Sequence, residues 1–392
     1  MSKLLFFFLT LISSNSFAEV YTEQYGEVEL SSSIFFEDIS GDNRKNTLNS
    51  AALEYNFFFE NNSLSGKLKV KAALSDPEAA QDVDFNEAYL DYAYNDFNVL
   101  VGNNIVFWGK NEFYNPVDVV NSKDFSGGLA QGEKMGQPMI NVKRYFDTSE
   151  LNLFILPATT NTYPTSKVRP QLALNIDSAD TFAKGASKNN TGMAARWSGY
   201  INEYDYGFSF YQGNTKDPAL VVTAGQLVPK YSEITQLGLD VQATRGDILY
   251  KGEMIYRDNQ YDYSGNISDY TNLIVGLEQS NFGIFGQNWD LANIVEYAYD
   301  TRGSNSHHGY QNDVFFANRI TLNDIHDTSI LLALSRDLNT ESGIFSSTIS
   351  RRIFGLFKTD LEVFIPLDLK NDTHLASSSK DKSLGMNISW FW

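Results

Sequence analysis

Apolar and polar residues alternate along most of this chain, in segments separated by clusters of Asn, Asp, Gly and Ser. The last segment, SLGMNISWFW, places Leu384, Met386, Ile388, Trp390 and Trp392 at every second position. Successive side chains of a strand point to opposite faces, so this pattern predicts a strand with one apolar and one mostly polar face. Because such segments recur from end to end, the sequence predicts an all-β fold.

Eighteen segments carry this alternation. They are 24–36, 47–59, 64–74, 84–95, 97–107, 137–145, 149–157, 190–200, 203–212, 231–243, 247–258, 268–280, 288–300, 309–321, 327–336, 343–351, 357–366 and 382–392.

The connections between these segments alternate in length. After even-numbered strands they are short, as in ENNS, ND, FDTS, INE and TRG, whereas three of the others are much longer, at 108–136, 158–189 and 213–230. Short turns at one end and long loops at the other are typical of outer-membrane barrels. The sequence therefore predicts a transmembrane antiparallel up-and-down β-barrel of about 16–18 strands.

The two faces of the predicted strands differ in charge. In 247–258, Tyr250, Met254 and Tyr256 share one face, and Lys251 and Glu253 lie on the other. Ionised groups are costly in hydrocarbon, so we expect the apolar face to meet lipid and the charged face to line a lumen.

The N-terminus has the layout of a secretory signal. Lys3 precedes the apolar run from Leu4 to Ile12, and Ser16 and Ala18 stand where small residues precede cleavage. The run is too short to span a bilayer as a helix. We therefore predict a signal peptide at 1–18, cleaved after Ala18, and a barrel at 19–392.

Composition excludes several classes of function. The chain has no Cys and only four His, which removes disulfides and thiolate metal sites and leaves few metal ligands. The formal net charge of −18 argues against nucleic acid, whose phosphates require a basic surface. No later segment predicts a transmembrane helix, and no cofactor or metal site is expected.

The final strand resembles that of Gram-negative outer-membrane proteins, which end on a terminal aromatic residue read by the barrel-assembly machinery. The matching residues are Leu384, Met386, Ile388, Trp390 and Trp392, although that family ends in Phe more often than in Trp. The resemblance covers the architecture of 19–392. It implies export to the outer membrane, contact with its lipid and lipopolysaccharide, and assembly by that machinery.

Three lysines at alternate positions are the first candidate lumen feature. Lys67, Lys69 and Lys71 face inward if Leu64, Leu68 and Leu74 face out. A hairpin centred near residue 79 would place them opposite Asp91, Tyr89 and Glu87, respectively. Two interpretations stay open: a salt-bridged wall that fixes the strand register, or a basic strip that acts on permeating solutes.

The loop at 107–136 is the second candidate. Pro116 and the Asn and Asp residues around it predict fixed turns. The stretch WGK…NPVDVVNSKDF resembles a motif of porin-like outer-membrane barrels, and general porins fold the loop at this position into the lumen, although their Pro-Glu-Phe-Gly-Gly-Asp core is absent. The loop either packs on the rim or folds inward as a constriction. Folded inward, it would present Lys110, Glu112, Asp118, Lys123 and Asp124 to solute.

The function expected from this pattern is passive passage of small hydrophilic solutes through a porin-like channel. The negative net charge of the chain favours cations, but the charges expected in the lumen balance. We therefore expect only a weak preference for cations. The expected lumen charges are Lys67, Lys69, Lys71, Arg196, Lys251, Arg257 and Lys358 against Glu54, Glu87, Asp91, Asp240, Glu253, Asp360 and Glu362.

Two other functions also fit an outer-membrane barrel. A barrel that exports or takes up amphiphilic compounds and an adhesin-like structural barrel are the alternatives. No G-x-S-x-G, H-E-x-x-H or phosphate-binding motif occurs, so an enzyme is not expected. The pair His307 and His308 offers too few ligands for a strong metal site. A homotrimer is suggested only by analogy with porins of this size.

Overall fold

The computed structural model describes residues 20–37, 45–76, 82–125, 132–163, 174, 176–177, 181–183, 185–372 and 374–392. The predicted signal peptide and its cleavage after Ala18 lie outside these residues.

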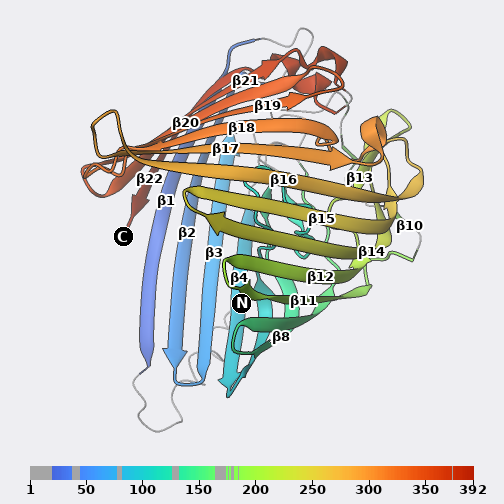
Figure 1. Cartoon of the computed structure of the whole chain (residues 1–392). Helices are drawn as coiled ribbons and strands as arrows, with labels where there is room; N and C mark the ends of the chain where they lie inside the picture. Colours follow the sequence, from blue (N-terminus) through green and yellow to red (C-terminus); the bar gives the residue numbers. More distant parts are fainter. Residues whose placement is uncertain are drawn as a thin grey trace.

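Eighteen strands form one closed antiparallel barrel (Figure 1). They are β1 (Tyr21–Phe35), β2 (Thr47–Asn61), β3 (Leu64–Asp76), β4 (Asp82–Tyr94), β5 (Phe97–Asn104), β8 (Gln137–Tyr145), β9 (Ser149–Pro157), β11 (Thr191–Ile201), β12 (Tyr204–Asn214), β14 (Gln226–Arg245), β15 (Ile248–Tyr261), β16 (Ile267–Ile284), β17 (Trp289–Asp300), β18 (Asn312–Thr321), β19 (Ser329–Asp337), β20 (Gly343–Ile353), β21 (Phe357–Leu367) and β22 (Ser383–Phe391). The predicted barrel is confirmed, and the largest displacement of a predicted strand end is at β14, which begins at Gln226 rather than 231.

Small elements decorate the barrel. β10 (Thr181–Ala183) and β13 (Ala219–Thr223) pair with the first part of β14, and β6 (Lys123–Asp124) pairs with β7 (Glu133–Lys134). Within the described ranges, no helix is long and apolar enough to cross a membrane.

Tight turns define one end of the barrel, which we call the short-turn end. Asn62, Asn95 and Asn202 take positive φ values of 44°, 50° and 53° in three of these turns. Asn tolerates this left-handed conformation, which the hairpin turns that match strand twist require. The opposite end carries the longer connections and is called the long-loop end.

The faces of the strands match the predicted alternation. On β15, Tyr250, Met254 and Tyr256 are each 46% exposed, whereas Lys251 and Glu253 are buried. The apolar exterior is suited to lipid. Closure of the ladder also pairs the backbone groups of the first and last strands, which would be costly to leave unpaired in hydrocarbon.

β22 closes the barrel on β1. Val28 lies opposite Trp390, and Gly26 and Trp392 exchange two backbone hydrogen bonds of 3.2 Å. A Cβ at Gly26 would come within 2.0 Å of the Trp392 ring, so the glycine leaves the space that this ring occupies. The predicted terminal strand thus forms the seam, with Met386, Trp390 and Trp392 on the exterior.

The predicted pairing of the lysine strand was wrong by two or three residues. Lys67 lies opposite Tyr89, Lys69 opposite Glu87, and Lys71 opposite Asp84. The register changes between Lys69 and Val70, where β4 carries an extra residue. The expected hairpin centre near residue 79 accounts for the error of two residues, because Lys67 and Tyr89 lie equally far from residue 78, and the β-bulge adds one more residue at Lys71.

Candidate functional site

The described part of the connection from β5 to β8 runs through the interior of the barrel. We call these residues, 105–125 and 132–136, the interior loop. Asn121 ties its two ends together: its Nδ2 donates to the carbonyls of Asn104 and Met135, both at 2.9 Å, and its Oδ1 accepts from the Val106 N–H at 2.9 Å. Because Asn121 is buried, these contacts fix where the loop leaves and rejoins the wall.

One side of the interior loop is apolar and packs on the wall. Val117, Val119 and Val120 are at most 1% exposed. Together with Trp108 they form a core whose wall residues come from strands between β5 and β16. This core includes Leu100, Met139, Phe154, Leu156, Ala194, Tyr211, Ile234, Ile255 and Tyr270. The loop therefore covers this part of the inner wall.

A tight turn shapes the tip of the loop. The Asn115 side-chain oxygen accepts from the Asn111 N–H at 3.1 Å, and its carbonyl accepts from the Asp118 N–H at 3.1 Å. Gly109 has a φ of +110°, and a Cβ there would come within 2.4 Å of Asn115 Oδ1. The Gly and Asn-Pro signals of the sequence thus correspond to a compact turn.

Two wall carboxylates receive the backbone of the tip. Glu253 Oε1 accepts from the N–H groups of Lys110 at 2.6 Å and Asn111 at 3.0 Å, and from Asn111 Nδ2 at 2.9 Å. Glu296 Oε1 accepts from the Glu112 N–H at 2.7 Å, and its Oε2 accepts from the Phe113 N–H at 3.1 Å. β16 lies between these strands and carries Gly276, where a Cβ would come within 2.8 Å of Glu296.

The side chain of Glu112 continues the contact. It bonds Lys251 Nζ at 2.9 Å and Arg319 at 3.1 Å, and Lys251 also bonds Glu278 at 3.0 Å. Burial acts to raise the pKa of Glu112, but the hydrogen bond and charge of Lys251, followed by Arg319, outweigh it and lower the pKa. Glu112 is therefore held as an anion at the tip.

Asp118, another predicted lumen residue, pairs with Lys134 within the loop. Burial raises the pKa of Asp118 and lowers that of Lys134, in each case against the attraction of the partner. Lys134 also donates to the Val106 carbonyl at 2.6 Å and lies 3.9 Å above the Phe107 ring. The pair joins the two arms of the loop.

The three predicted lysines form ion pairs along β3. Lys67 bonds Glu87 at 2.6 Å, Lys69 bonds Glu54 at 3.0 Å, and Lys71 bonds Glu133 of the interior loop at 2.8 Å. Their side chains are 26–27% exposed. The sequence brought the lysines and Glu87 to one wall, but Glu133 as a partner was not foreseen.

The remaining predicted residues are less closely joined to this arrangement. Asp91 accepts from Asn98 Nδ2 at 3.2 Å on the neighbouring strand. Lys110, Lys123 and Asp124 are partly exposed on the interior loop, and the last two form β6. Asp124 lies opposite Glu133, the partner of Lys71, in the pairing of β6 with β7.

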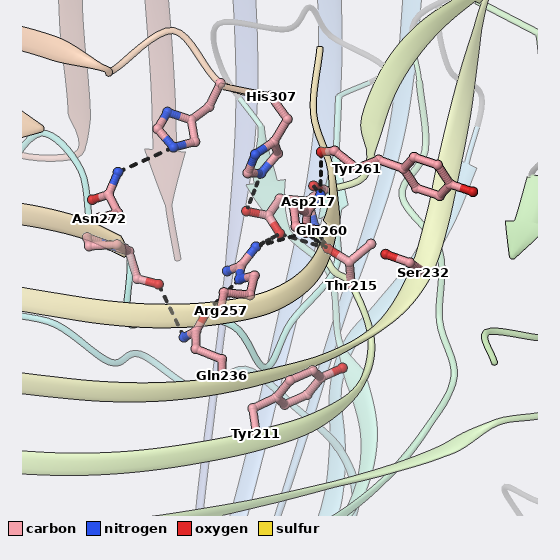
Figure 2. A network of polar contacts seen from close by, with 12 residues as sticks. Tyr211, Thr215, Asp217, Ser232, Gln236, Arg257, Gln260, Tyr261, Asn272 and His307 are labelled. Atoms are coloured by element: carbon pink, nitrogen blue, oxygen red, sulfur yellow. Dashed lines mark hydrogen bonds and ion pairs between the residues drawn. The ribbon is translucent and has the colours of Figure 1, made fainter. Parts of the chain in front are cut away.

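Sequence reasoning missed a polar network at the long-loop end (Figure 2). Arg257 donates to Asp217 at 2.7 Å and to Gln236 at 2.8 Å, and His307 Nε2 lies 3.1 Å from Asp217. The Arg302 guanidinium lies 2.9 Å from His307 Nδ1. Because arginine only donates, Nδ1 accepts and Nε2 carries the proton that bonds Asp217. Of these residues only the buried Arg257 was on the expected lumen face. Gln236 lies on β14, whereas Asp217 and His307 come from long loops.

Lys216, beside this network, was also missed. Its Nζ donates to Gln137 Oε1 and Thr159 Oγ1, both at 2.7 Å. Burial lowers the pKa of Lys216 to about 7.

The pair His307 and His308 interacts with carboxylates: His307 lies beside Asp217, and His308 lies beside Asp300. The described residues contain no group of three or more His, Cys, Asp or Glu able to hold a metal.

Structural comparison agrees with the barrel. No family model and no curated protein matches the chain. Pseudomonas aeruginosa OccK11 (OpdR) is similar over 94% of this chain and 95% of its own, with a TM-score of 0.55 and 9% identity. Wzi, an Escherichia coli outer-membrane protein involved in group 1 capsule assembly and called a carbohydrate-binding β-barrel, is similar over 93% and 83%, with a TM-score of 0.53 and 12% identity. At these identities the likeness shows the fold alone: the chain has the fold of outer-membrane β-barrels.

Proposed function

We propose that this protein is an outer-membrane channel for passive passage of small hydrophilic solutes, with a weak preference for cations. The interior loop is the constriction. The observation that carries the proposal is the uneven covering of the inner wall. Ile234, Asp240, Ile255 and Glu296, on β14 to β17, are at most 2% exposed, whereas Lys67, Lys69 and Lys71 of β3 keep about a quarter of their side-chain surface exposed.

A lumen formed by eighteen strands is too wide for wall side chains alone to fill. The interior loop packs on one half of the wall, so the water-filled path lies between the loop and the remaining strands. Lys71 and Glu133 join the two sides of this path. A hydrophilic solute would therefore pass charged groups on both sides. Contacts with these groups would replace part of the water bound to the solute.

The preference for cations follows from the wall between β21 and β1. Glu27 and Glu29 face inward on β1, as do Asp360 and Glu362 on β21. Against these four carboxylates, strands β21, β22 and β1 carry one lysine, Lys358, which lies 3.1 Å from Asp360. The lysines of β3, by contrast, are each paired with a carboxylate. An excess of carboxylates concentrates cations in the path, and pairing keeps the effect small.

The test is conductance across a planar bilayer separating two salt concentrations. The purified protein should give stepwise conductance with a reversal potential of the sign that marks modest cation preference. A correctly folded barrel that conducts no ions would refute the proposed channel function. Binding of an amphiphile or of a surface ligand would then be tested. Anion preference would leave the channel but reject the proposed role of the β21–β1 wall.

A further inference from the structure

The tip of the interior loop presents successive backbone N–H groups to the wall. Those of residues 110–113 all donate to carboxylate oxygens of Glu253 or Glu296. A buried peptide N–H without an acceptor costs free energy, and hydrogen bonds to charged acceptors are among the stronger ones. Two wall side chains thus accept all four of these backbone N–H groups.

We infer that Glu253 and Glu296 are the positioning residues that hold the constriction across the lumen, and that Gly276 provides the notch that admits the loop. This inference rests on the proposed channel function. A Cβ at Gly276 would lie 2.8 Å from Glu296 Cγ and 3.2 Å from Asn111 Oδ1. Both of these atoms belong to the contact between the loop tip and the two glutamates, so even one methyl group at residue 276 would disturb that contact.

The two glutamates use their oxygens differently. Glu296 places one N–H on each oxygen, whereas Glu253 collects its donors on Oε1, and its buried Oε2 has no hydrogen-bond partner among the described residues. A glutamine has one acceptor oxygen and one NH2 group. At 253 it can keep the oxygen on the donors, but at 296 its NH2 group must face an N–H. Glu296→Gln should therefore undock the tip more than Glu253→Gln.

The absence of Cys in the chain allows a direct readout. Val117 lies on the side of the loop that packs on the wall and is 0% exposed, so a cysteine introduced by Val117→Cys reacts with a small charged thiol reagent only when the tip lifts. In this background, Glu296→Gln should accelerate labelling about tenfold or more, as expected for the loss of a hydrogen bond to a charged group. Glu253→Gln should have a smaller effect, and open-channel conductance should rise in the same order.

Glu362→Gln is the matched control. It also removes one inward carboxylate, but its contact is with Asn387 at 3.1 Å, away from the loop. It should leave the labelling rate unchanged. Gly276→Ala undocks the tip by a different route with both carboxylates present, and should also accelerate labelling. Heat-modifiable migration in gels shows whether each variant is folded. If Glu296→Gln does not fold, the labelling rate of Gly276→Ala tests the inference instead.

The outcomes separate this inference from the channel itself. Labelling that is equally slow in the parent, Glu296→Gln and Gly276→Ala would overturn the positioning role, even if the parent conducts. Faster labelling in Glu253→Gln than in Glu296→Gln would overturn the division between the two oxygen sets. Fast labelling of the variants in a barrel that does not conduct would support docking of the loop and reject the channel.

Discussion

The two halves of the inner wall are built on different principles. From β14 to β17 the wall is covered by the interior loop, and its charged groups are buried and bound, as Glu253 and Glu296 are by backbone N–H groups. From β2 to β4 the lysines are paired with carboxylates side chain to side chain, as Lys67 is with Glu87 and Lys69 with Glu54, and they stay partly exposed. The same alternating pattern thus serves as a protein core on one half and as a water-facing wall on the other.

The largest difference is expected from a carboxylate placed in each half. Val117→Asp buries a charge in the apolar contact of the loop and should destabilise the barrel by several kcal/mol. Ser31→Asp adds the same group to the partly exposed inner face of β1 and should change stability by no more than about 0.5 kcal/mol. Denaturant midpoints of the two variants, each compared with the parent, measure the difference. Equal losses would mean that both halves are equally closed to water.

Acid should loosen the covered half through His307. Burial lowers the pKa of His307 to about 3, from an ordinary value of ~6.5. Its contribution to stability is therefore complete above pH ~6.5 and is lost as the pH falls toward 3, by up to ~1.4 kcal/mol per unit. Unfolding midpoints measured across this range should fall more steeply for the parent than for His307→Gln.

The control for this pH dependence is His326→Gln, in a turn at the short-turn end. It should follow the parent. Glutamine at 307 can still donate to Asp217 and accept from Arg302, so the comparison isolates protonation. Parallel curves for the parent and His307→Gln would contradict the burial of a neutral imidazole in this network.

Charge reversal on the open half should change selectivity with little loss of stability. Lys67→Glu combined with Lys69→Glu removes two ion pairs and places like charges beside Glu87 and Glu54. The reversal potential in a salt gradient should move clearly toward cations, because the path then holds an excess of carboxylates. Replacing both lysines by Met should give about half the shift, as half the charge is changed. An unchanged potential in both variants would remove β3 from the conducting path.

The smallest effect is expected on the interior loop. Asp118→Asn leaves the positive charge of Lys134 without its partner, and Asp124→Asn removes a partly exposed carboxylate. Each should lower cation preference slightly, and the double variant should lower it further. Reversal potentials at low ionic strength are the suitable measurement, because salt at ~0.15 M screens such charges over about 8 Å. An unchanged potential in the double variant would show that these loop carboxylates do not border the path.

The fold followed from the sequence because a membrane barrel repeats one local rule. Strict alternation and the lengths of the connections located each strand, and the exposed Tyr250 beside the buried Lys251 shows how directly the two faces follow. The pairing of β3 with β4 was wrong because it assumed a hairpin centred near residue 79, whereas Lys67 and Tyr89 pair at equal distances from residue 78, and a bulge changes the register by one further residue at Lys71. Register is a property of two strands and is poorly encoded in either one.

The candidate site could be predicted only in part. The compact turn at Gly109 and Asn115 was visible as local turn chemistry. Glu253 was expected on the inner face, but nothing in its neighbourhood along the chain indicates that it binds residue 110. Asp217 and His307 meet only because two long loops converge. Contacts between residues so far apart depend on the closed barrel and have no local signature.

The closing seam has a consequence for how the barrel forms. Pairing β1 with β22 joins the two ends of the described barrel, so its entropic cost comes from a very long loop and the favourable contacts come only once the strands meet. The space above Gly26 accepts the Trp392 ring, and their backbones pair in both directions. An in-register encounter is thereby rewarded over a slipped one. Filling that space with Gly26→Val should slow the final closing step, even where the finished barrel loses little stability.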